Sequence, residues 1–192
     1  MRRGAIVLAT IAAAACGAGK NPSRIPEGDG PLVAVYRAEI TGSTGASSRK
    51  ARLLVWAAAP DRLHAELLPP IGGSPVTLDA GEGRAVLVDV SERTAYVGEG
   101  GPDAVASLTG VRIGVADAVD ALLTGASPEG ARIEREGGAE GALPDRFSIE
   151  VGGAKVALTR LRWERGASGD TEIGTGIPPP GWRVRPLAEW ER

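Results

Sequence analysis

Several residue types are nearly missing from this chain of 192 residues. It contains one cysteine, one histidine, one methionine and one phenylalanine, and four of its few aromatic residues are tryptophans. A single cysteine excludes an intramolecular disulfide. One histidine cannot start the cluster of three or four ligands that a zinc site needs. We therefore expect a domain that relies on its apolar core, with no metal and no non-covalent cofactor.

An excess of charge of one sign is also missing. Lysine and arginine number 22 against 24 acidic residues, for a net charge of -2. Nucleic-acid-binding domains usually carry a basic excess, so nucleic acid is not an expected partner. His64 is the only histidine that could activate a nucleophile, and its alternation with Leu63 and Ala65 places it on the polar face of a strand. We predict no catalytic residue and no enzyme. The enzymatic alternative is an envelope hydrolase built around His64.

The apolar runs are short. Residues 4–15 carry no charge, but a membrane-spanning helix needs about 20 apolar residues. This run follows Arg2-Arg3 and ends in small residues, Ala13-Ala14-Ala15, directly before Cys16. That layout is typical of a secretory signal peptide. We predict a signal peptide over residues 1–15, a polar tether rich in glycine and proline over 16–31, and one domain over 32–192.

The segment Ala13-Ala14-Ala15-Cys16 resembles the lipobox of bacterial lipoproteins, in which the cysteine is acylated and becomes the new N-terminus. The resemblance implies covalent acyl chains on Cys16 and a lipid anchor. Leucine is more usual in the place of Ala13, and an ordinary signal peptide cut before a free thiol is the alternative. Gly17 is not the aspartate that commonly retains lipoproteins in the inner membrane, so the outer membrane is favoured.

Short alternating apolar segments begin at Leu32 and recur about every ten residues, which predicts an antiparallel sheet. A second period interrupts it: Val115, Val119 and Leu122 fall on one stripe of a helix. A shorter helix is expected over residues 102–108, opened by Pro102. The expected strands lie near residues 33–40, 53–56, 62–67, 76–78, 86–90, 94–97, 146–151 and 155–163. The pattern therefore predicts a mainly β domain of roughly 8–11 strands with a few short helices.

One ordered series of segments resembles the LolB-like outer-membrane lipoproteins, the LolA/LolB fold family. The likeness covers roughly residues 36–125, and residues 178–187 suit the family's closing strand. The segments that carry it are Pro60-Asp61-Arg62-Leu63, Leu67-Leu68-Pro69-Pro70-Ile71-Gly72, Thr77-Leu78, Ala85-Val86-Leu87-Val88-Asp89, Ala95-Tyr96, Leu108-Thr109-Gly110 and Ala121-Leu122-Leu123-Thr124-Gly125.

The resemblance implies an incomplete antiparallel barrel whose apolar concave face is partly covered by helices. It also implies a function, which is to bind the acyl chains of lipoproteins, take them from a LolA-like periplasmic carrier and help to insert them in the outer membrane. The chain would be a monomer, anchored on the periplasmic face. Exposing a sixteen-carbon chain to water costs on the order of 13 kcal/mol, at about 0.8 kcal/mol per methylene, so such transport needs an apolar container.

The alternating apolar positions are the candidates for lining that container, although the same residues can equally form a closed core. Ile71 is the candidate for an apolar side chain that protrudes from the loop over residues 69–75, unless it folds back onto its own sheet. The runner-up function is an envelope-assembly or apolar-ligand-binding lipoprotein of the same fold that does not transfer lipid. The candidate cavity residues are Val35, Leu53, Val55, Leu63, Leu67, Leu78, Val86, Val88, Val119, Leu122 and Leu123.

Overall fold

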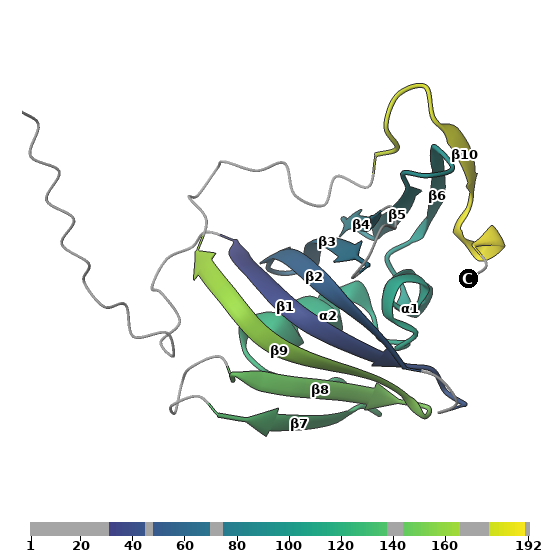
Figure 1. The fold of residues 1–192 in the computed structure, drawn as a ribbon. Helices are drawn as coiled ribbons and strands as arrows, with labels where there is room; N and C mark the ends of the chain where they lie inside the picture. The colour runs from purple at the N-terminus through teal and green to yellow at the C-terminus, as the bar shows by residue number, and fades with distance from the viewer. Residues whose placement is uncertain (1–30, 45–47, 70–74, 138–143, 166–176, 191–192) are drawn as a thin grey trace, which may run out of the picture.

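The chain folds into a ten-stranded sheet that curves around two short helices (Figure 1). The structure is a computed structural model that describes residues 31–44, 48–69, 75–137, 144–165 and 177–190. The strands are β1 (Leu32–Thr41), β2 (Ser48–Ala58), β3 (Arg62–Leu68), β4 (Val76–Gly81), β5 (Arg84–Asp89), β6 (Thr94–Glu99), β7 (Arg132–Glu136), β8 (Arg146–Val151), β9 (Ala154–Arg165) and β10 (Arg183–Pro186).

The strands follow the order β10-β6-β5-β4-β3-β2-β1-β9-β8-β7. The two outermost strands, β10 and β7, do not pair with each other, so the sheet does not close into a full barrel. This confirms the expected fold class, a mainly β domain shaped as an incomplete barrel. One detail differs: β10 runs parallel to β6, while the other pairs are antiparallel as expected.

Both predicted helices are present, α1 (Pro102–Thr109) and α2 (Val115–Leu123). A glycine with positive φ follows each helix, as expected for a helix end. The Gly110 N–H donates to the Ala106 carbonyl over 2.7 Å, and the Gly125 N–H donates to the Ala121 carbonyl over 3.0 Å. These bonds satisfy carbonyls that the last helical turn leaves without partners.

We call the side of the sheet that faces the helices the inner face and the opposite side the outer face. Helix α2 packs on β2 and β3, and α1 packs on β4, β5 and β6. Because successive strand residues point to opposite sides, every second residue of a strand enters the layer beneath the helices. On β3, for example, Leu63, Ala65 and Leu67 are each 4% exposed. This layer is the main core of the domain.

Strand β7 was not predicted from the sequence. Its five residues, Arg132–Glu136, include one apolar side chain, Ile133. Both faces of this strand are largely polar because it forms an edge of the sheet, and it therefore shows no alternation. The predicted closing strand does exist, as the four-residue β10, which is exposed along its whole length.

The C-terminal residues cross back onto the inner face. A short 3-10 helix, η1 (Leu187–Glu189), packs against β6 at Gly98. A Cβ atom at position 98 would lie 2.8 Å from the Leu187 Cβ atom, so this approach requires glycine. The Trp190 ring then contacts the Tyr96 ring edge-on, with 5.0 Å between centroids. This segment thus fastens the end of the sheet next to α1.

Candidate functional site

Most of the predicted cavity residues meet in one layer. Val119 and Leu122 of α2 face the sheet, and Leu123 packs half-buried against the same core. The predicted sheet residues that lie in this layer are each no more than 5% exposed. Those on the inner face are Leu53, Val55, Leu63, Leu67 and Leu78.

The predictions for Val35, Val86 and Val88 were wrong, because all three lie on the outer face. In β5, Leu87 pairs with Leu78 and enters the core, so its neighbours Val86 and Val88 point the other way. In β1, the buried set is Leu32, Ala34, Tyr36, Ala38 and Ile40, which places Val35 outside. Both strands carry apolar residues on both faces, so the sequence alone does not reveal which set is inward.

The inner layer is closed in this structure. Leu78 and Val119 are each 1% exposed, and Leu122 is 8% exposed. A space large enough for an acyl chain would leave accessible surface on the side chains that line it. Among the described residues of this layer, the predicted cavity side chains have little such surface, except for the half-buried Leu123, so we expect a covering helix to move when a ligand enters.

Two side chains tie the C-terminal end of α1 to the rest of the molecule. The Arg49 guanidinium, at the start of β2, donates to the Leu108 carbonyl over 3.0 Å. The Trp190 indole N–H donates to the Ser107 carbonyl over 3.1 Å. A cation at this end also interacts favourably with the helix dipole. Partial burial lowers the pKa of Arg49, although an arginine stays charged at neutral pH.

One polar group inside the layer was not predicted from the sequence, the hydroxyl of Tyr36. Tyr36 is 2% exposed, and its ring meets that of Phe147 edge-on at 6.0 Å. Burial raises the pKa of Tyr36 to about 12, and the positive charge of Arg160 offsets part of the rise. Arg160 lies opposite Tyr36 on β9. Only the register of β1 against β9 brings the two together, so no local sequence signal could have identified them.

The Arg160 side chain is itself 5% exposed. Its guanidinium forms an ion pair of 2.5 Å with Asp145 and lies 5.5 Å from the centre of the Trp163 ring. The positive charge is therefore held at the border of the apolar layer by a carboxylate on the outside and an aromatic ring beside it. Burial of a charge is costly unless it is paired in this way.

His64 lies on the outer face as predicted, but it is half-buried and does not stand free in solvent. Its Nδ1 atom lies 3.4 Å from Asp79 and its Nε2 atom 3.3 Å from Glu66, and Trp56 packs on the ring edge-on at 5.1 Å. Burial lowers the pKa of His64, but the hydrogen bonds and charges of Asp79 and Glu66 outweigh this effect, so the pKa lies above its usual value.

Among the described residues, the hydrogen-bond partners of both ring nitrogens of His64 are carboxylates, not a serine hydroxyl. Within the described part of the chain, no group of three His, Cys, Asp or Glu residues is placed to hold a metal ion.

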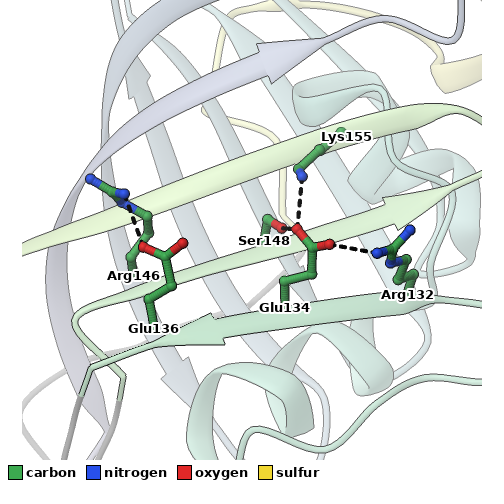
Figure 2. A network of polar contacts seen from close by, with 6 residues as sticks. All are labelled: Arg132, Glu134, Glu136, Arg146, Ser148 and Lys155. Carbon is green, nitrogen blue, oxygen red and sulfur yellow. Dashed lines mark hydrogen bonds and ion pairs between the residues drawn. The ribbon is translucent and has the colours of Figure 1, made fainter.

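A third polar cluster covers the outer face of β7, β8 and β9 (Figure 2). Glu134 accepts hydrogen bonds from Lys155 over 3.1 Å and from Ser148 over 3.4 Å, and it also pairs with Arg132 at 2.8 Å. The hydrogen bond and the charge of Lys155 contribute most to the lowered pKa of Glu134. The charged groups are exposed and satisfy one another, as expected of a solvated sheet face.

Two predicted features, the acylated Cys16 with its signal peptide and the protruding Ile71, lie outside the described residues. No helix in the described part of the chain is both long and apolar enough to cross a bilayer. A scan against protein-family models finds no match, and a search of curated proteins finds none either.

Proposed function

We propose that this chain is a lipid-anchored protein of the outer membrane, facing the periplasm, that binds the acyl chains of lipoproteins and helps to insert them in that membrane. The observation that carries the proposal is the inner face. Nine of the ten strands, counted without the short edge strand β10, contribute side chains to one apolar layer or pack against it, and two short helices cover it. A container for acyl chains needs this combination of a large apolar surface and a small movable cover.

The cover is held by few polar contacts. Helices α1 and α2 are eight and nine residues long, and isolated helices of this length are not stable in water. Their position therefore depends on apolar packing and, for α1, on the hydrogen bonds from Arg49 and Trp190. An acyl chain that displaces a helix makes apolar contacts of the same kind with the sheet. The exchange of helix for ligand therefore exposes little apolar surface to water.

The lipid anchor rests on the lipobox-like segment that ends at Cys16. An anchored acceptor would receive its cargo from a soluble LolA-like periplasmic carrier, as the resemblance to the LolB-like lipoproteins implies. This transfer needs no catalytic group, because the cargo moves between apolar surfaces without a change of covalent bonds.

The alternative is an envelope-assembly or apolar-ligand-binding lipoprotein of the same fold that does not transfer lipid. The closed inner layer favours the envelope-assembly role, since a fully packed core needs no ligand. Uptake of an apolar molecule by the folded protein separates both ligand-binding functions from an envelope-assembly protein with a closed core.

Uptake is tested with N-phenylnaphthylamine, whose fluorescence rises in apolar surroundings, added to the folded full chain. If α1 must move, Arg49→Met should raise the apparent affinity by about tenfold. A hydrogen bond to a charged donor is worth about 1.5 kcal/mol or more, and the apparent Kd falls as the open fraction grows. Methionine keeps the unbranched stem while removing the donor.

Arg62→Met is the matched control. Arg62 is an exposed arginine on the adjacent strand β3, and it pairs with Glu82 at 3.0 Å instead of with α1. Arg62→Met should leave the affinity for the probe unchanged. A chain that takes up no probe below its melting temperature, with or without Arg49, would refute the container function and leave the envelope-assembly lipoprotein.

A further inference from the structure

The buried Tyr36 hydroxyl has no hydrogen-bond partner among the described residues, although its residue is 2% exposed. Buried polar groups in folded proteins are paired in the great majority of cases, and each exception calls for an explanation. A hydroxyl left unpaired in an apolar layer costs free energy, since it has lost its bonds to water. A tyrosine here is thus unfavourable compared with a phenylalanine unless something else accepts its hydrogen bond.

The backbone next to Tyr36 is irregular as well. The pairing of β1 with β9 shifts between Val35 and Tyr36, because β9 contains one extra residue at this point, Leu161. Bulges of this kind redirect side chains and are frequent beside functional sites. Here the bulge leaves Leu161 47% exposed and sets Arg160 opposite Tyr36 on the inner face.

The inner side chains around Tyr36 form an ordered row. The register places four apolar or aromatic positions next to one another across β4, β3, β2 and β1, and the row ends at a cation on β9. Strands lie about 4.8 Å apart, so the row extends for roughly 19 Å. Its members in order are Val76, Leu67, Leu53, Tyr36 and Arg160.

An acyl chain has the same layout, a hydrocarbon run with oxygen at one end. We propose that the Tyr36 hydroxyl, beside Arg160, is a binding site for the oxygenated end of an acyl ligand, and that the hydrocarbon lies along Leu53 and Leu67. The hydroxyl donates a hydrogen bond to the ligand's carbonyl or carboxylate oxygen. Arg160 contributes a positive charge without giving up its pair with Asp145. This inference rests on the proposed function, because the helices must first admit the ligand.

The test uses the full chain made by cell-free synthesis, where no acylating enzyme is present. Three probes are compared: diphenylhexatriene, which has no oxygen, methyl laurate, which has an ester, and laurate, which has a carboxylate. Tyr36→Phe should leave the affinity for diphenylhexatriene unchanged. It should lower the affinity for methyl laurate roughly two- to tenfold and the affinity for laurate roughly ten- to a hundredfold, as expected for the loss of a neutral and of a charged hydrogen bond.

Tyr96→Phe is the matched control, because Tyr96 is the only other tyrosine and packs on Trp190 near α1, away from this row. It should change none of the three affinities. The comparison of laurate with methyl laurate separates a free fatty acid from an esterified chain as the preferred ligand.

Stability provides the second readout. If the hydroxyl has no partner in the unliganded protein, Tyr36→Phe should keep or raise the melting temperature. A clear fall would reveal an internal partner and overturn the inference, as would an equal loss of affinity for all three probes. Failure of diphenylhexatriene to bind the parent chain would instead refute the container function, and this site with it.

Discussion

The two faces of the sheet differ in the interactions that hold them. On β3, three side chains that are each 4% exposed alternate with Arg62, His64 and Glu66, which are exposed or half-buried. The inner face is held by apolar contacts, while the outer face of β7–β9 is covered by charges that pair across strands (Figure 2). The inner face therefore contributes most of the stability, and the outer face of β7–β9 should tolerate substitution.

The largest effect is expected on the inner face, from Leu78→Ala. Leu78 is 1% exposed beneath the helices, and removing a buried leucine side chain costs about 2–5 kcal/mol. Val184→Ala, at a position that is 57% exposed on β10, should change the free energy of unfolding by no more than about 0.5 kcal/mol. Urea denaturation followed by tryptophan fluorescence measures both values. Equal costs would contradict a tightly packed layer.

An intermediate effect is expected at His64, on the outer face. Burial opposes its charged form, yet Asp79 and Glu66 raise the pKa of His64 in the folded state above the value of 6.5 that the unfolded chain is expected to have. The charged imidazole thus stabilises the fold fully below about pH 6.5, and this stabilisation is lost as the pH rises through the folded pKa. The melting temperature of the parent should fall relative to that of His64→Gln as the pH is raised above about 6.5.

If the melting temperatures of the parent and of His64→Gln changed equally with pH, the two carboxylates would not act on His64. Glu92→Gln is a suitable control, because Glu92 is an exposed turn residue outside this cluster. Introduced into both proteins, Glu92→Gln should leave the difference in melting temperature between the parent and His64→Gln unchanged at each pH.

The smallest effect is expected at Arg37, also on the outer face. Arg37 of β1 lies directly opposite Arg52 of β2, and like charges in that position are destabilising. Arg37→Gln should therefore raise the free energy of unfolding, by about 0.2–1 kcal/mol at low salt, with the gain shrinking as salt is added. Arg146→Gln, which removes an arginine paired with Glu136 at 3.0 Å, should give no gain. A loss of stability in Arg37→Gln would show that the arginine is structural.

Much of the fold could be predicted, because the spacing of apolar residues along a segment indicates whether the segment is a helix or a strand and which of its faces is buried. In α2, Val115, Val119 and Leu122 repeat at helical spacing and are all buried. Strand β3 alternates cleanly, so both its existence and its inner face were predicted. Strand β5, by contrast, contains Ala85-Val86-Leu87-Val88 without a break, and its pairing with β4 decides which of these residues point inward.

The candidate site could be predicted only in its apolar part. Leu53 and Leu67 lie in alternating strands and were found by that pattern. Tyr36 and Arg160 are more than a hundred residues apart, and a bulge determines which residue of β9 faces Tyr36. Sequence periodicity describes one element at a time, so a group assembled from two strands and an irregular register is not visible to it.

The parallel pairing of β10 with β6 has a consequence for the order of folding. Arg183 pairs with Thr94, and the Trp190 indole bonds to Ser107, which is 83 residues earlier in the chain. Contacts across such a separation form late, since a long loop must close before they contribute. The antiparallel neighbours β1 to β6 are joined by short connections and can assemble first. Helix α1 thus acquires its hydrogen bond from Trp190 last, and a nascent chain that still lacks residues 183–190 would hold the C-terminal end of α1 through Arg49 but not through Trp190.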